Sequence, residues 1–250
     1  MRKHLPLLTF LGLFIWASLG TGVSLPKFVE GLGDMGRFVK EMFPADFSEV
    51  SAVWPDFVLT LRMAWVSTLV GALLAYPFAL LAAGTTTTWK SINGLFRLLL
   101  NGVRTVPDLL LASLAVALFG ANPSAGAVAL TLFSMGIIGK LLFETLESID
   151  QGPLEAMTAL GAPWIARLRY GALPLALPQF LTYCLYVFEI NIRVAAIVGL
   201  VGAGGIGVWM NINFDLGQYQ KVAALLVTLF LVVTVIDAVS TRIRKALAQA

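Results

Sequence analysis

Two pairs of oppositely charged residues lie inside apolar stretches of the sequence. Arg104 and Asp108 are four residues apart, and so are Glu189 and Arg193. This spacing places both members of a pair on one face of a helix. Charges within a bilayer are costly and face a bundle interior or a water-filled path. Each pair therefore predicts either an internal ion pair or a path on which an anion meets an arginine. We favour the internal ion pair, because each arginine has an acidic neighbour.

Two further features belong to the same stretches. Asn191 adds an amide to the segment of Glu189 and Arg193, on a different face of the helix, and is a further candidate for the solute path. Pro107 leaves a backbone carbonyl without its helical partner, which predicts a hinge at mid-membrane. The glycines Gly202, Gly204, Gly205 and Gly207 follow the same segment, and we expect them to allow close backbone approach and bending in an extracytoplasmic gate.

Several kinds of chemistry are excluded. The spacing of Gly202, Gly204 and Gly207 matches the dinucleotide fingerprint, but no βαβ unit surrounds it. No Gly-x4-Gly-Lys-[Ser/Thr] phosphate loop is present, so the chain is not expected to hydrolyse ATP. No His, Cys, Asp and Glu set has metal-ligand spacing, and no nucleophile has a base beside it. We therefore expect neither an enzyme nor a metal site.

Residues 150–174 form a polar island between two long apolar stretches. Pro153 suits the first turn of a helix, and Glu155 faces the partial positive charge of that helix start. Gly161 can end this helix and Pro163 can begin a second one. The island predicts two short helices at a membrane surface, which present a docking feature or, in the plainer interpretation, form an interfacial linker.

The elements that position these residues are apolar helices. Hydrophobic residues make up 58% of the chain and charged residues 12%, about half the charged share of soluble domains. We expect an all-α membrane protein of six spans, in which residues 57–245 form the core. Residues 1–56 then hold a first span, retained rather than cleaved as a signal, and an extracytoplasmic amphipathic helix. The expected spans are 5–19, 57–83, 95–119, 125–143, 175–200 and 222–238, and a polar connection leads from the glycines to Lys221.

The lysines and arginines predict the orientation. The termini, the 84–97 turn and the 140–172 loop carry ten of them, against four in the other connections. Because the richer side is cytoplasmic, both termini and the polar island are expected in the cytoplasm. The net charge of +3 is modest, and we expect membrane lipid rather than nucleic acid as the surroundings of the chain.

The polar island resembles the EAA loop of permease subunits of bacterial ATP-binding-cassette (ABC) importers. That pattern is Glu-Ala-Ala, three residues, Gly, nine residues and Ile-x-Leu-Pro. The spacing here is the same, with Met157 in place of the second Ala and Gly171 in place of Ile. The matching run is Glu155-Ala156-Met157, Gly161 and Gly171-Ala172-Leu173-Pro174. The resemblance implies a type I importer permease fold and a helix that docks into a groove of a separate ATPase.

A narrower resemblance covers about Arg104 to Gly207, where three runs are similar to permeases of phosphonate and phosphite importers. These are 104–110, 148–156 and 189–207, with Asp108 in place of the expected Glu. The resemblance implies a homodimer in the inner membrane, two ATPase copies that hold ATP and Mg, a periplasmic or lipid-anchored binding protein, and a phosphorus oxyanion as solute. Methionine-type permeases share the glycine-rich stretch, so another small solute is the alternative, and an unenergised channel or a membrane enzyme is the rival from another class.

Overall fold

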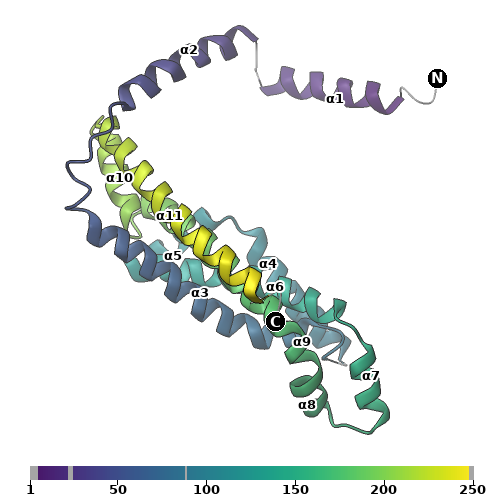
Figure 1. The fold of residues 1–250 in the computed structure, drawn as a ribbon. Helices are drawn as coiled ribbons and strands as arrows, with labels where there is room; N and C mark the ends of the chain where they lie inside the picture. Colours follow the sequence, from purple (N-terminus) through teal and green to yellow (C-terminus); the bar gives the residue numbers. More distant parts are fainter. Residues whose placement is uncertain (1–4, 22–24, 88, 248–250) are drawn as a thin grey trace.

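The computed structural model describes residues 5–21, 25–87 and 89–247, and all regular structure in this part of the chain is helical. Figure 1 shows an elongated body with α2 at one end and α7 and α8 at the other. The basic residues Arg2 and Lys3 lie outside the described residues. The helices are α1 (Leu5–Thr21), α2 (Leu25–Met42), α3 (Trp54–Ala82), α4 (Lys90–Thr105), α5 (Asp108–Phe119), α6 (Pro123–Ser148), α7 (Gly152–Ala159), α8 (Trp164–Arg167), α9 (Leu173–Val198), α10 (Ile206–Asp215) and α11 (Tyr219–Leu247).

Four helical segments of the described chain are each long and apolar enough to cross a membrane. They are α3, α6, the run from α8 through α9 to Val201, and α11. The 29 residues of α3 reach about 43 Å, more than a hydrocarbon core of about 30 Å requires. The pairs α1 with α2 and α4 with α5 each pass the same test only when counted together. The chain thus supports four to six spans, and the expected six require each bent pair to count as one.

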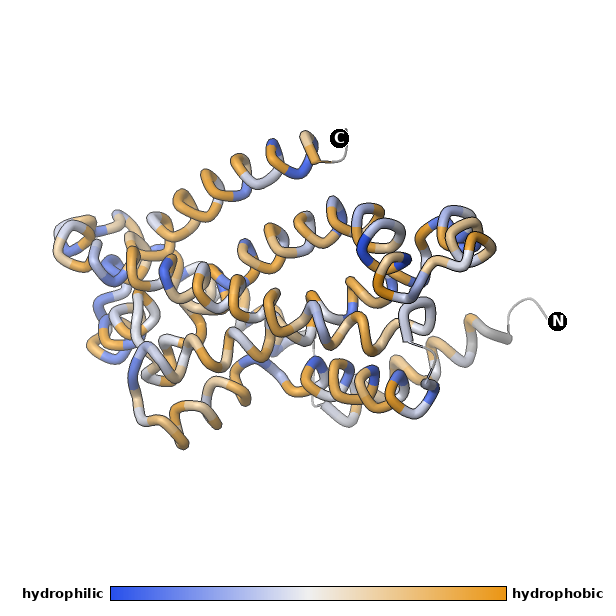
Figure 2. Tube along the Cα trace, turned by 90° about the horizontal axis from the view of Figure 1, so that it is seen from below, coloured by the Kyte–Doolittle hydropathy of each residue, from blue (hydrophilic) through white to orange (hydrophobic). Residues whose placement is uncertain are grey.

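The core of the body is the packing of α3 against α6, with α9 alongside. Small residues permit this approach: a Cβ added to Gly71 would lie 2.5 Å from Cβ of Ser134. Gly139 receives the side chain of Leu100 from α4 in the same way. Small residues at such contacts are how membrane helices approach closely without a hydrophobic driving force. Figure 2 shows that apolar residues predominate along most of the helices, and many large apolar side chains are exposed, as contact with lipid requires.

The third expected span, 95–119, is wrong as a single helix. It is divided into α4 and α5, whose axes are bent by 92° at Val106 and Pro107. Pro107 is extended, with φ −56° and ψ 142°, and its carbonyl accepts the backbone N–H groups of Leu110 and Leu111 in the first turn of α5, each at 3.0 Å. Proline lacks the N–H that would continue α4, so the chain turns here instead of only bending. Arg104 and Asp108 consequently lie on different helices, and the expectation that they share one helix face is wrong.

The remaining boundaries agree only in part with the expected ones. Asn122 caps α6 by accepting the backbone N–H groups of Ser124 and Ala125. The amphipathic segment forms α2, which meets the body where Phe38 packs edge-on against Tyr219 with ring centroids 4.9 Å apart. The connection before Lys221 contains a helix, α10, that its polar composition did not predict. The last helix continues to Leu247, nine residues beyond the expected end of its span.

Candidate functional site

The polar island is a helix–turn–helix unit at the end of the body opposite α2 (Figure 1). Pro153 lies in the first turn of α7, and the carboxylate of Asp150 accepts the N–H of Gly152 at 2.9 Å. The helix ends at Ala159, and Gly161 follows its C-cap with a φ of +74°, the left-handed conformation that glycine adopts without strain. The N–H of Ala162 returns to the carbonyl of Met157 at 2.9 Å, a Schellman closure. The expected end of the first short helix is confirmed.

The second short helix is confirmed as well, and it holds the first in place. Pro163 directly precedes α8, which is four residues long. The guanidinium of Arg167 donates to Oγ1 of Thr158 on α7 at 2.8 Å. The indole N–H of Trp164 donates to the carbonyl of Thr86, in the turn between α3 and α4. The island is therefore fixed to the body by side chains of α8.

The two residues that depart from the EAA pattern lie together. A Cβ built on buried Gly171 would lie 2.6 Å from Leu154 and 3.3 Å from the sulfur of Met157, both on α7. Met157 is larger than the alanine of the pattern, and Gly171 is smaller than its isoleucine. The two exchanges offset each other in volume, and such swaps are the ones that packed interfaces tolerate best. Gly171 thus allows α7 to rest on the following segment.

That segment connects the island directly to a membrane helix. Residues Leu168–Ala172 form a π-helical turn that continues without interruption into α9, which begins at Leu173 and Pro174. π-turns within helices are rare and are found frequently at functional sites. A displacement of α7 and α8 therefore has a continuous helical path into the interior of the body.

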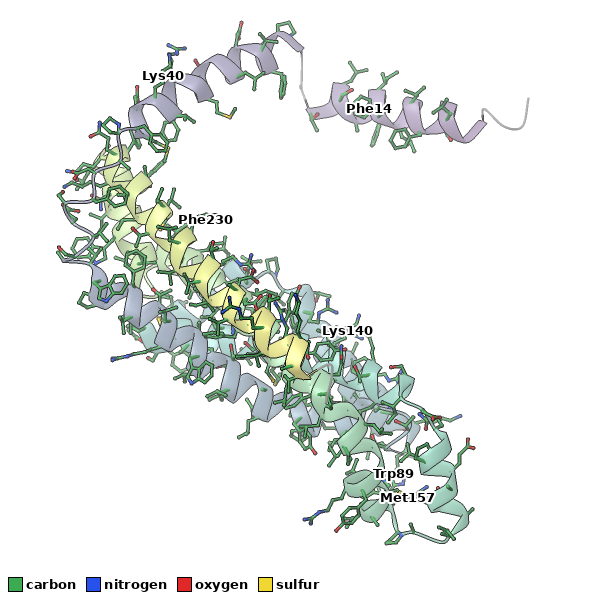
Figure 3. All side chains as sticks on the ribbon, viewed as in Figure 1. Phe14, Lys40, Trp89, Lys140, Met157 and Phe230 are labelled. Atoms are coloured by element: carbon green, nitrogen blue, oxygen red, sulfur yellow. The ribbon has the colours of Figure 1, made fainter. Side chains whose placement is uncertain are left out.

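The outer face of α7 is open. Glu155 and Ala156 are exposed, and Leu160 has an exposed fraction of 88%. Among the described residues, Glu155 forms no ion pair. It borders a hollow of about 200 Å³ between α7, α8 and the turn at Thr85 and Thr86. Figure 3 shows Met157 of α7 and Trp89 at this same end of the molecule.

The charges of α9 have partners other than those predicted. The buried carboxylate of Glu189 lies 3.0 Å from the guanidinium of Arg244 on α11, and Asp237 lies 3.7 Å from the same guanidinium. The expected pair of Glu189 with Arg193 is not formed. Arg193 is exposed and borders a cavity of about 440 Å³ between α9 and α11, together with Glu189, Thr234 and Asp237. Within the described chain no ion pair of Arg193 is found.

Asn191 has a structural position. It is fully buried, and its amide donates to the hydroxyls of Thr68 on α3 and Ser134 on α6 at 2.8 and 2.7 Å. It therefore joins three helices in the core. This placement gives no support to the expected contact with a solute.

The other two intramembrane candidates stay apart as well. Arg104 is exposed at the end of α4, and Asp108 accepts the N–H of Leu109 at the start of α5. No ion pair between them occurs in the described part of the chain. Both flank the turn at Pro107, so the turn presents a guanidinium and a carboxylate on separate helix ends.

The glycine-rich segment confirms the expected close approach. A Cβ on Gly207 would lie 1.9 Å from the carbonyl oxygen of Ala196, so α10 packs directly on the backbone of α9. A Cβ on Gly205 would meet Thr60 of α3 at 2.5 Å, and the hydroxyl of Thr60 accepts the N–H of Ile206. Gly202 and Gly204 have positive φ angles in the same loop. The segment joins α3, α9 and α10 at the end of the body opposite the island.

One ionic cluster near the island was not predicted from the sequence. Arg97 of α4 forms an ion pair with Glu147 of α6, and Glu147 also accepts the N–H of Gly84 at 2.7 Å. Arg97 further donates to the carbonyl of Ala82, the last residue of α3, at 2.9 Å. These residues lie up to 65 positions apart, and no local spacing relates them. Arg244 was missed as a partner for the same reason.

These features define a class of protein: an all-helical, multi-pass membrane subunit with the fold of type I ABC importer permeases. A subunit of a methionine ABC transporter in an inward-facing conformation shares the fold with a TM-score of 0.71 at 23% identity, over 81% of this chain and 99% of that one. A subunit of an amino acid ABC transporter shares it with a TM-score of 0.67 at 19% identity, over 82% and 100%.

The family is settled by sequence comparison. Residues 75–249 match the family described as binding-protein-dependent transport system inner membrane component, and the chain belongs to it. The putative phosphite transport system permease protein HtxC of Stutzerimonas stutzeri is 35% identical, over 89% of this chain and 79% of the relative. The phosphite transport system permease protein PtxC of the same organism is 35% identical over 87% and 79%. The phosphate-import permease protein PhnE of Mycolicibacterium smegmatis is 34% identical over 85% and 40%.

Proposed function

We propose that this chain is the membrane subunit of an ATP-driven importer for a phosphorus oxyanion, such as a phosphonate, phosphite or phosphate ester. Two copies of the chain would form the channel, and two copies of a separate ATPase, which hold ATP and Mg, would dock on the cytoplasmic side. A periplasmic or lipid-anchored binding protein would deliver the solute. The observation that carries the coupling proposal is the exposed face of α7, fixed on a helix that runs unbroken into the body.

The physical argument for coupling is mechanical. Glu155, Ala156 and Leu160 form an open face on α7, of the kind that enters a groove on a partner. Because α7 rests on Gly171 and is held by Arg167, closure of the ATPases would move α8, the π-turn and α9 together. The far end of α9 meets the segment Gly202–Gly207, where we place the extracytoplasmic gate.

The substrate proposal rests on the relatives, whose names specify phosphite or phosphate, and on the chemistry of the α9–α11 cavity. In that cavity the guanidinium of Arg193 has no carboxylate of the described residues bound to it, whereas the charge of Glu189 is neutralised by Arg244. Guanidinium groups bind tetrahedral oxyanions with two parallel hydrogen bonds. The methionine transporter shares only the fold, and no observation favours a channel or an enzyme.

The coupling proposal is tested by exchanging residues on α7. Glu155→Lys or Gly161→Asp should abolish co-purification of the ATPase, because the first reverses the charge of the docking face and the second adds a carboxylate beside it. Glu30→Lys on exposed α2 is the control with the same change of charge. The chain should remain inserted in every variant. Normal co-purification with both α7 variants would contradict the proposal.

The solute path is tested by transport in vesicles that contain the ATPase and the binding protein. Arg193→Ala should reduce phosphite or phosphonate uptake at least about tenfold, since a charge-assisted hydrogen bond is worth about 1.5–3 kcal/mol. ATPase assembly should be unchanged. Arg62→Ala, at an exposed arginine of α3 outside this cavity, is the control. Unchanged uptake by Arg193→Ala would exclude this residue from the path, and uptake of methionine instead would reject the substrate class.

A further inference from the structure

An apolar groove lies beside the island and has a single cation among its lining residues. It has a volume of about 300 Å³ and runs between the ends of α3 and α6 and the start of α9. Tyr76 and Phe180 face each other in it with ring centroids 6.0 Å apart. Arg169 of the π-turn contributes the only charged side chain of the described lining. The groove is thus amphipathic, apolar along its length and cationic at one point.

The dimensions of the groove correspond to one leaflet of a bilayer. Arg169 and Phe180 are separated by about 16 Å along the helix, at 1.5 Å per residue. Half of a hydrocarbon core is about 15 Å. Arg169 belongs to the polar island, which we expect at the membrane surface, and its guanidinium lies 5.7 Å from the ring of Tyr170. An acyl chain that fills the groove would therefore place its headgroup beside Arg169.

The charge specifies the headgroup. Arg169 is exposed and forms no ion pair with any described residue. Basic pockets between membrane helices bind anionic lipid headgroups, and a guanidinium matches the geometry of a phosphate. A zwitterionic lipid also carries a cationic group in its headgroup, which would be repelled by the guanidinium of Arg169.

We infer that this groove is a binding site for an anionic phospholipid of the leaflet on the side of α7 and α8, with the phosphate at Arg169 and an acyl chain against Tyr76 and Phe180. The site would place a lipid against the π-turn through which α7 and α9 are joined. This inference does not depend on the transported solute or on the ATPase.

The test measures lipid retention by the full-length chain, in detergent with any subunits that co-purify, using native mass spectrometry. Phosphatidylglycerol and phosphatidylcholine serve as probes. We expect phosphatidylglycerol to bind in preference to phosphatidylcholine. Arg169→Gln should weaken phosphatidylglycerol binding about fivefold, the effect of one cation at a lipid surface. Arg242→Gln, at an exposed arginine of α11 outside the groove, should change it less than twofold.

A second variant separates the two halves of the site. Leu177 is exposed at the groove wall, and Leu177→Trp should fill the groove and reduce binding of both lipids without changing the unfolding temperature. Equal binding of both lipids by the wild-type chain, or unchanged phosphatidylglycerol binding by Arg169→Gln, would overturn the inference. Loss of dimer or of ATPase in Arg169→Gln with lipid binding intact would assign the groove to a protein interface instead.

Discussion

Glu189 shows how a buried charge in this chain finds its partner. The carboxylate is inside the body, where an isolated charge is costly, and its counter-ion comes from α11, 55 positions later in the sequence. Arg193, one helical turn away, remains exposed at the neighbouring cavity. Glu189 and Arg244 therefore stabilise the contact of α9 with α11. Arg193 is not used in this ion pair, and we propose that it binds the anionic solute.

A double-mutant cycle tests this pairing. Arg244→Gln should lower the free energy of unfolding by about 3 kcal/mol, because it leaves a buried carboxylate without its counter-ion. The double variant with Glu189→Gln should recover most of this loss, since neither charge then remains unpaired. Chemical denaturation in detergent measures both. Additive losses in the double variant would show that the pair contributes no coupling energy.

Asn191 is a buried polar residue whose partners also come from other helices. Its amide is the donor to two hydroxyls from α3 and α6, each of which already donates to a carbonyl of its own helix. Hydrogen bonds between membrane helices are worth about 0.6 kcal/mol on average, so the residue contributes modestly to stability and chiefly to the register of three helices.

At the scale of elements, the island, the π-turn and α9 form one unit. The contact of Met157 and Leu154 with Gly171 determines how α7 sits on this unit. The cap at Gly161 and the hydrogen bond from Arg167 to Thr158 fix the two short helices to each other. The island is consequently joined to α9 without a flexible linker.

Because the volumes of Met157 and Gly171 offset each other, we expect a smaller residue at position 157 to compensate for a larger one at position 171. Gly171→Ile should lower the free energy of unfolding by about 1–3 kcal/mol, the usual cost of overpacking, and should weaken ATPase co-purification. Adding Met157→Ala should restore part of both. Gly102→Ile is the control, because a Cβ at Gly102 of exposed α4 meets no atom within 4 Å. If Gly171→Ile lowers the free energy of unfolding and ATPase co-purification no more than Gly102→Ile does, the contact with Gly171 does not hold α7 in position.

At the scale of the whole molecule, the two ends of the body are built from different features. The island and the Arg97–Glu147 cluster occupy one end, and the glycine-rich segment with α10 occupies the other. The excess of lysine and arginine on the side of the island predicts, by the positive-inside rule, that the island lies in the cytoplasm.

Cysteine labelling tests this orientation. The single native cysteine is first removed as Cys184→Ser. Leu160→Cys on α7 should then react with a membrane-impermeant maleimide only after the membrane is opened. Leu216→Cys, also an exposed leucine but after α10, should react in intact cells. The reverse pattern would place the island outside and reject the proposed coupling.

The features that could be predicted from the sequence are local. Pro153, Gly161 and Pro163 mark helix ends through their own backbone preferences, and all three occur where expected. The apolar stretches predicted membrane helices because each helix satisfies its own backbone hydrogen bonds.

The sequence alone thus determined that the chain is an all-helical membrane subunit, where most helices lie, and which run forms the island, because these depend on hydropathy, caps and spacing over a few residues. The tertiary structure decided that α4 and α5 are bent by 92°, that Glu189 pairs with Arg244, and that Met157 lies against Gly171. These features arise from the three-dimensional packing of helices, in which residues far apart in sequence compete for the same space and charge.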